Sequence, residues 1–194
     1  MLSALLCGSC NLCSENYKIV LPEGKVRADL HNHLRTFSTM KNFNGYIDHA
    51  LTVLEKGGIL GVVNFSDARY EEFVSLKGYE RVKVGNGNAY YVPEKDILFV
   101  KGQEVETNGG HLLAIGIPSG EHLSDHRTIE DTIKEIKDVN GLVVIDHPFY
   151  LDGILTDADN FKFLREVDAI EIWNGSANLF IKTPQLVNLK PMPR

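Results

Sequence analysis

Short apolar runs alternate with amphipathic segments along the chain from about residue 25 onward. Continuous apolar runs are typical of strands that are buried on both faces of a parallel sheet. The predicted strands are residues 26–31, 59–65, 97–100, 111–117, 142–145 and 168–173. Repeated strand–helix units with apolar strands predict an α/β fold built on a mainly parallel sheet or barrel.

The amphipathic segments between these strands have the apolar spacing of helices. The predicted helices are residues 45–56, 125–139 and 160–167. Gly57 and Gly58 favour the end of the first helix, because glycine readily adopts the left-handed conformation that follows a helix. Ser124 or Asp125 is expected to cap the second helix.

Residues 70–96 interrupt this rhythm. Two short strand-like segments, residues 81–84 and 89–92, flank residues 85–88, which form a Gly-Asn-Gly-Asn turn sequence. Two strands separated by such a turn predict a β-hairpin. We therefore expect a hairpin that leaves the main sheet.

The composition is that of an ordinary globular protein. With 194 residues, 43% hydrophobic and 24% charged, the chain is expected to form a single domain. The formal net charge of -6 disfavours broad binding of nucleic acid through bulk charge. No stretch approaches the roughly 20 apolar residues that a membrane helix needs, so no membrane partner is expected.

The first 24 residues contain all three cysteines and are expected to form a tail before a domain at residues 25–194. Cys7, Cys10 and Cys13 are compatible with three kinds of segment. These are a metal or cluster site without a nearby fourth ligand, an export signal that leaves Cys7 lipidated, and a disordered tail of reduced thiols. The third reading is preferred and implies a cytoplasmic protein, with a lipid-anchored or exported form as the alternative.

Asp29, His31 and His33 alternate at the end of the first predicted strand. Side chains two residues apart on a strand project to the same face. Because neutral imidazole nitrogens are common ligands of transition metals, two histidines at this spacing are able to hold one metal ion. A surface loop with two histidines is the plain alternative, and the other strand ends decide between the two.

Further ionisable side chains follow the other predicted strands, where α/β proteins place their active sites. Glu104 follows strand 97–100, and His147 follows strand 142–145. His111 begins a strand, and it lies near Glu104 if that strand runs antiparallel to the preceding one. Four histidines and a carboxylate suit transition metals better than magnesium, and Glu104 is suited to bridge two ions.

The same motifs resemble, in order, those of the PHP superfamily, named for polymerase and histidinol phosphatase. Residues 29–33 (Asp-Leu-His-Asn-His) look like its first motif, and residues 102–104 (Gly-Gln-Glu) with 110–116 (Gly-His-Leu-Leu-Ala-Ile-Gly) look like its third. Residues 146–148 (Asp-His-Pro) are similar to its later histidine–proline motif, and residues 168–174 resemble the strand that follows.

This resemblance implies a distorted (β/α)7 TIM-like barrel with a metal site for the hydrolysis of phosphoesters. The implied cofactors are divalent ions, Zn, Mn or Fe, with two ions expected and three as the alternative. Matched residue by residue, the implied metal ligands are His31, His33, Glu104, His111 and His147.

Three features depart from the family pattern. Residues 66–68 read Ser-Asp-Ala where the family usually has Thr-Asp-His, so Ala68 replaces a ligand. Thr39 follows Ser38 where an acidic residue is usual. No Asp-x-His pair follows Asn174, and the barrel is therefore expected to lack its last strand–helix unit.

Metal-dependent hydrolysis of phosphoesters by metal-activated water is the predicted function. Asp67 would orient or deprotonate the water, and Arg35 and Arg69 would bind the substrate phosphate. The acidic charge favours small phosphate monoesters, nucleotides, or short oligonucleotides and nucleic-acid ends as substrates. Because Ala68 and Thr39 weigh against turnover, the alternative is a non-catalytic metal- or phosphate-binding module derived from such an enzyme. Hydrolysis of a cyclic amide is a third reading, but no lysine ends a predicted strand in the position that this chemistry often uses.

Overall fold

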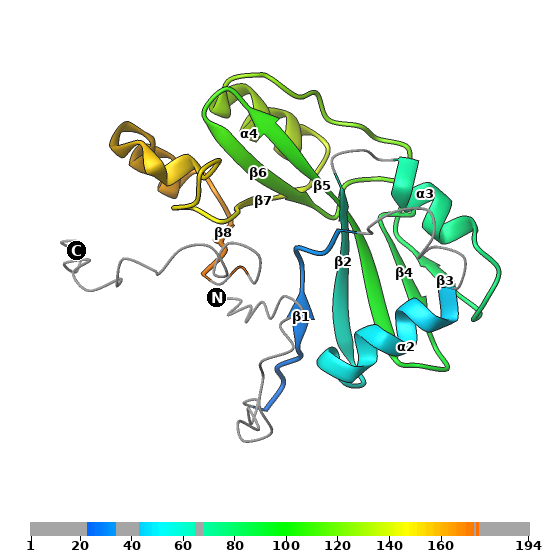
Figure 1. Ribbon diagram of the computed structural model, residues 1–194. Helices are drawn as coiled ribbons and strands as arrows, with labels where there is room; N and C mark the ends of the chain where they lie inside the picture. Colours follow the sequence, from blue (N-terminus) through cyan, green and yellow to red (C-terminus); the bar gives the residue numbers. More distant parts are fainter. Residues whose placement is uncertain (1–22, 34–42, 65–67, 173, 175–194) are drawn as a thin grey trace.

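The protein is described by a computed structural model that covers residues 23–33, 43–64, 68–172 and 174 (Figure 1). Within these ranges the chain forms one eight-stranded sheet. A hairpin of β3 (Val82–Val84) and β4 (Ala89–Val92) joins this sheet at β5 and lies off its main path, as the sequence predicts. The main path runs in the order β1 (Ala28–Asp29), β2 (Gly58–Asn64), β5 (Ile97–Thr107), β6 (Gly110–Ile115), β7 (Leu142–Ile145) and β8 (Ala169–Ile170).

The direction of each strand decides which residues meet at each rim of the sheet. β1 pairs with β2, β2 with β5, and β7 with β8 in parallel, whereas β6 runs antiparallel to both β5 and β7. The carboxyl ends of β1, β2, β5, β7 and β8 therefore share one rim with the amino end of β6. β6 is antiparallel because only Asn108 and Gly109 join it to β5, a connection far too short for a parallel crossover.

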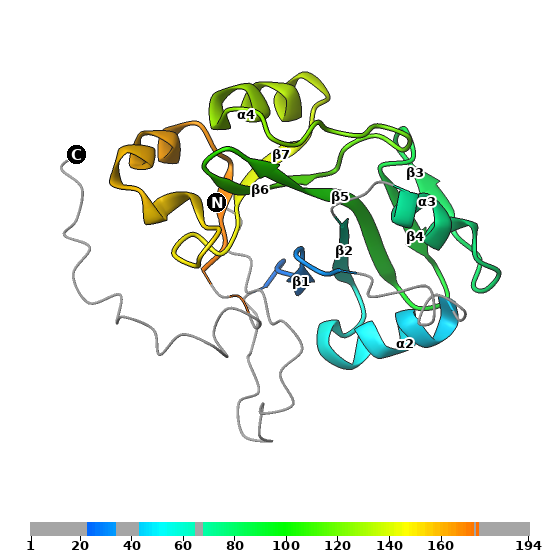
Figure 2. The ribbon, with the colours of Figure 1, turned by 45° about the horizontal axis from the view of Figure 1, so that its top comes forward.

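The sheet curls into a half-barrel (Figures 1 and 2). The prediction of a mixed helix and strand fold is confirmed, but the described sheet is not mainly parallel, because three of its seven strand pairs are parallel and four are antiparallel. Among the described residues, the path ends at β1 on one side and at β8 on the other, so these two strands are its edges.

Helices cover the outer face of the curled sheet. α2 (Phe43–Leu54) and α3 (Ala68–Ser75) contact β2, and α4 (Ile129–Asp138) contacts β7 and β5. Two 3-10 segments follow β7, η1 (Ile154–Thr156) and η2 (Ala158–Arg165). None of the described helices has the length and apolar character of a membrane span.

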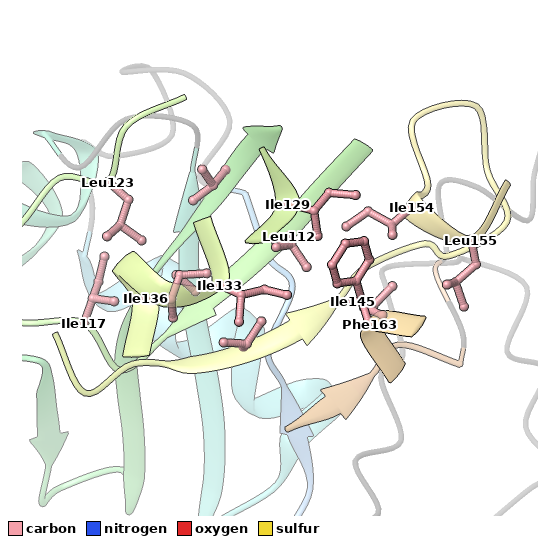
Figure 3. Packing of buried hydrophobic residues seen from close by; sticks show 13 residues of the cluster. Leu112, Ile117, Leu123, Ile129, Ile133, Ile136, Ile145, Ile154, Leu155 and Phe163 are labelled. Atoms are coloured by element: carbon pink, nitrogen blue, oxygen red, sulfur yellow. The ribbon is translucent and has the colours of Figure 1, made fainter. Parts of the chain in front are cut away.

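The apolar core is divided between the two faces of the sheet. One cluster lies on the outer face between β5, β6, β7, α4 and η2, with Ile136 and Phe163 almost fully buried in it (Figure 3). A second cluster packs α2 and α3 against β2 and β5. Because side chains alternate along a strand, the strand residues that do not point into these two clusters face the inside of the curl. The buried members of this inner cluster are Val63, Leu113, Ile115 and Val144.

Several predicted element ends differ from the structure. β1 covers only part of the predicted strand 26–31, and β8 covers only part of 168–173. β5 extends well past Val100 to Thr107, so Glu104 lies within the strand rather than after it. Residues 160–167 contribute to a 3-10 segment, η2, and α3 was not predicted at all.

The predicted cap of α4 is also wrong. Thr128 caps this helix, because its Oγ1 accepts the Asp131 N–H at 3.1 Å. Asp125 instead accepts the N–H of Glu106 at 3.0 Å. The carboxylate that looked like a cap therefore ties the segment before α4 to β5.

Candidate metal centre

The carboxylate of Glu104 lies at the centre of a group of imidazoles at the shared rim. Its Oε2 is 2.8 Å from His33 Nε2 and 3.4 Å from His31 Nε2. Its Oε1 is 2.8 Å from His111 Nδ1 and 3.2 Å from His147 Nε2. Each oxygen of one carboxylate thus faces its own pair of ring nitrogens.

Strand direction explains why residues so distant in sequence meet here. His147 follows the carboxyl end of β7, whereas His111 stands near the amino end of the antiparallel β6. The β5–β6 register places His111 opposite Glu106, two residues from Glu104. The prediction that His111 lies beside Glu104 in an antiparallel pair is therefore confirmed.

The chain beyond β1 is held against β2. Gly61 permits this approach, because a Cβ at that position would come within 2.8 Å of Leu30 Cα. The N–H of Val63 donates to the carbonyl oxygen of Asn32 at 3.0 Å. These contacts bring His31 and His33 to the rim although β1 itself ends at Asp29.

Asp29 takes no part in the group around Glu104. It accepts a hydrogen bond from Asn32 Nδ2 at 3.2 Å, and the Tyr46 hydroxyl donates to Asn32 Oδ1 at 2.7 Å. Burial raises the pKa of Asp29. Its role is to fix the loop that carries the two histidines.

Asp146 is a further carboxylate at the rim. Its side chain is fully buried, and among the described residues neither of its oxygens has a hydrogen-bond donor. Burial is also the main reason that its pKa is raised well above the ordinary range. Buried carboxylate oxygens are costly without donors or a cation, so Asp146 fits a metal ligand.

Four of these residues are close enough to share one ion. His31, Glu104, Asp146 and His147 each offer a ligand atom, and these atoms lie within 4.8 Å of one another. Two imidazoles and two carboxylates form a donor set suited to a divalent transition metal. This buried group could therefore hold a metal ion.

The charges in the group are strongly coupled. Burial disfavours the ionised form of Glu104, but hydrogen bonds from His111, His147, His31 and His33 outweigh it and lower its pKa. Burial likewise disfavours charged His31, yet its contacts with Glu104 and Glu171 raise its pKa to about 10. Since only neutral imidazole ligates a metal, protons would compete with a metal ion for this centre.

Glu171 lies beside this group and was not predicted. Its two carboxylate oxygens are 3.3 and 3.4 Å from His31 Nδ1. The His147 backbone N–H donates to its Oε2 at 2.6 Å, and Asn174 Nδ2 donates to both oxygens at 3.2 and 3.3 Å. The signal that could have identified Glu171 is its place directly after β8. The predicted strand extended to residue 173 and hid that strand end.

The structure thus brings together all five predicted metal ligands, and it adds Asp146 and Glu171. The other predicted site residues cannot be placed, because Arg35, Asp67 and the side chain of Arg69 lie outside the described residues. The three cysteines lie outside them as well.

A polar pocket of about 230 Å³ adjoins the group at His111. It lies between the β5–β6 turn and the loop before η1, and carboxylates line part of it. Its polar lining residues include Glu106, Thr107, Asn108, Asp152 and Thr156. A molecule bound at the group around Glu104 would have room to extend into this pocket.

Comparison with known protein families, with curated proteins and with solved structures gives no match to this chain.

Proposed function

We propose that this protein is a metal-dependent phosphoesterase that binds two divalent ions, Zn, Mn or Fe, around Glu104. The observation that supports it is the pairing of His31 and His33 on one oxygen of that carboxylate, and of His111 and His147 on the other. A carboxylate with a histidine pair on each oxygen is suited to bridge two ions. Two-metal sites of this kind serve the hydrolysis of phosphate esters.

The resemblance to the PHP superfamily supports the same proposal. The motifs follow that family's order along the chain, and we propose that the half-barrel belongs to a distorted (β/α)7 barrel of that type. The curled sheet with its strand ends at one rim is compatible with this architecture.

Ions held at this rim would supply the positive charge that activates water and stabilises the charge developing on the phosphate. The chain's own residues would provide the geometry. Glu104 would hold two metal positions at a fixed separation, and Asp146 would neutralise part of the added charge in the buried interior. The pocket beside His111 would receive the part of the substrate beyond its phosphate.

Three further roles belong to this proposal. Asp67 would orient or deprotonate the attacking water, and Arg35 and Arg69 would bind phosphate oxygens through their guanidinium groups. The substrates would be small phosphate monoesters, nucleotides or short oligonucleotides.

A second candidate is a metal-binding module without turnover. It is favoured by Ala68, which stands where the resembling family usually has a histidine ligand. Both candidates need the same cluster around Glu104, so metal binding and hydrolysis must be measured separately.

The experiment uses the full chain and a His31→Ala/His33→Ala variant, with His126→Ala as a matched control because His126 is largely exposed. Bound Zn, Mn and Fe are quantified by mass spectrometry, and hydrolysis is assayed with 4-nitrophenyl phosphate and bis(4-nitrophenyl) phosphate. We expect the wild type and the control to bind metal and turn over, and the double variant to lose both. Metal without turnover would favour the module, and unchanged turnover in the double variant would refute the hydrolase.

A further inference from the structure

Glu171 stands at the carboxyl end of β8 and is only 3% exposed. Its neighbours come from both sides of the curled sheet. His31 follows the edge strand β1, and His147 follows β7, which lies beside the other edge strand, β8. Among the described strands β1 and β8 are not paired with each other. The Glu171 carboxylate therefore links two parts of the rim that the described backbone hydrogen bonds leave apart.

The two ring nitrogens of His31 face different partners. Nδ1 lies 3.3 Å from Glu171 Oε1, whereas Nε2 faces Glu104 at 3.4 Å and His33 Nε2 at 3.2 Å. A carboxylate at Nδ1 favours a proton on that nitrogen, so in the neutral form of His31, which is the form that binds a metal, the lone pair of Nε2 points to the centre. Histidines that bind metals almost always donate their second ring N–H in this way.

The same carboxylate also holds His147, through the backbone rather than the ring. His147 has a φ of 21°, a positive value that residues other than glycine rarely adopt. Its N–H donates to Glu171 Oε2 at 2.6 Å. Backbone conformations of this kind persist only where surrounding contacts fix them, and Glu171 provides such a contact.

We propose that Glu171 is the positioning residue of the metal centre, orienting the His31 ring and fixing the His147 backbone at once. This inference rests on the metal centre proposed above, but not on its turnover. Asn174 completes the arrangement by donating to Glu171 and so holding the carboxylate in place.

The chain offers a matched control in Asp168. This residue immediately precedes β8 and accepts the Val143 N–H of β7 at 2.8 Å, which is the same kind of contact at the opposite end of the strand. Loss of either carboxylate should loosen β8 against β7. Only loss of Glu171 should change the geometry around His31 and His147.

The test compares wild type, Glu171→Ala, Glu171→Gln and Asp168→Asn as full chains. Zn²⁺ affinity is measured by competition with a chromophoric chelator, visible absorption of the Co²⁺ form reports ligand geometry, and thermal unfolding in EDTA reports stability. We expect Glu171→Ala to weaken Zn²⁺ binding about 10- to 100-fold and to shift the Co²⁺ bands. Glu171→Gln, which keeps one acceptor oxygen, should recover part of the affinity. Asp168→Asn, which likewise keeps one acceptor oxygen, should leave Zn²⁺ affinity within about twofold of the wild type.

Unchanged Zn²⁺ affinity and Co²⁺ bands in both Glu171 variants would overturn the positioning role, as would an equal loss of affinity in Asp168→Asn. If Glu171→Ala does not fold, Glu171→Gln against Asp168→Asn decides the question. Wild-type protein that binds no Zn²⁺ or Co²⁺ would overturn the metal centre itself. Metal binding without phosphatase activity would overturn only the proposed hydrolysis.

Discussion

Replacing Asp146 with Asn should have opposite effects on the metal-free and the metal-bound protein. The Asp146 carboxylate is fully buried, has no hydrogen-bond donor among the described residues, and lies among other buried carboxylates. An unsatisfied buried polar group costs about 1–3 kcal/mol. Asn is nearly isosteric and uncharged, so it removes the repulsion between the Asp146 carboxylate and those of Glu104 and Glu171.

In EDTA we therefore expect Asp146→Asn to be more stable than the wild type by about 1–2 kcal/mol. For a chain of this size that raises the melting temperature by roughly 2–8 °C. The difference depends on pH in a defined direction. Burial raises the pKa of Asp146 above the value of about 4 that an aspartate has in an unfolded chain. The folded wild type therefore loses stability as pH rises above about 4, and the variant escapes this loss.

Added Zn²⁺ should reduce or reverse this order. Free Zn²⁺ at 100 times the dissociation constant stabilises the wild type by about 2.7 kcal/mol. A tenfold weaker site gains about 1.4 kcal/mol less at the same concentration. The assay is urea and thermal unfolding in EDTA and in Zn²⁺, from pH 4 to 8. Asp168→Ala is the control, because the Asp168 carboxylate accepts the Val143 N–H and its removal should destabilise both forms. An Asp146→Asn protein less stable than the wild type in EDTA would refute the reasoning.

Three further substitutions separate the centre from the fold that holds it. Glu104→Gln should reduce bound Zn²⁺ from about two ions to one or none, and it should lower any phosphatase activity at least about 100-fold. Retention of both ions would contradict the bridging role of Glu104. Ile136→Ala, in the cluster beneath α4, should lower the free energy of unfolding in urea by about 2–5 kcal/mol and leave Zn²⁺ affinity within about twofold of the wild type. A large loss of affinity would show that this core cluster and the metal centre are coupled. Thr128→Ala should cost about 1 kcal/mol through loss of the α4 cap, and an unchanged unfolding free energy would mean that Thr128 Oγ1 does not cap α4 in solution.

The alternation of apolar runs was sufficient to predict most of the sheet, because strands buried on both faces carry a strong signal. It was not sufficient for α3. Among the described side chains of that helix Tyr70 and Phe73 are fully buried, and two inward positions do not establish a helical period. The cap of α4 was misassigned for another reason. Asp125 has the chemistry of a cap, but the N–H of Glu106 in β5 takes its carboxylate, and no local pattern reveals that distant partner.

The candidate metal centre likewise combines residues that local sequence predicts with residues whose importance depends on the fold. His31, His33, Glu104, His111 and His147 could be predicted because strand ends of a parallel sheet converge, whatever the details of packing. Asp146 was noted only as the neighbour of His147, and its importance comes from complete burial without a donor, which a sequence does not reveal. Glu171 was missed because its importance depends on the curl, which brings the end of β8 to the end of β1.

Because the sheet curls, contacts within the candidate metal centre also join the two sides of the half-barrel. The edge strands β1 and β8 have two residues each, too few to hold the two sides of a half-barrel together by pairing. At the rim His31, which follows β1, contacts Glu171, which follows β8. Three carboxylates that are at most 3% exposed lie there, Glu104, Asp146 and Glu171. Imidazole partners favour the ionised forms of Glu104 and Glu171, and burial beside them opposes a third negative charge on Asp146 unless a divalent cation balances it. A cation bound at the rim would therefore favour its closure, and closure of the rim would favour binding of the cation.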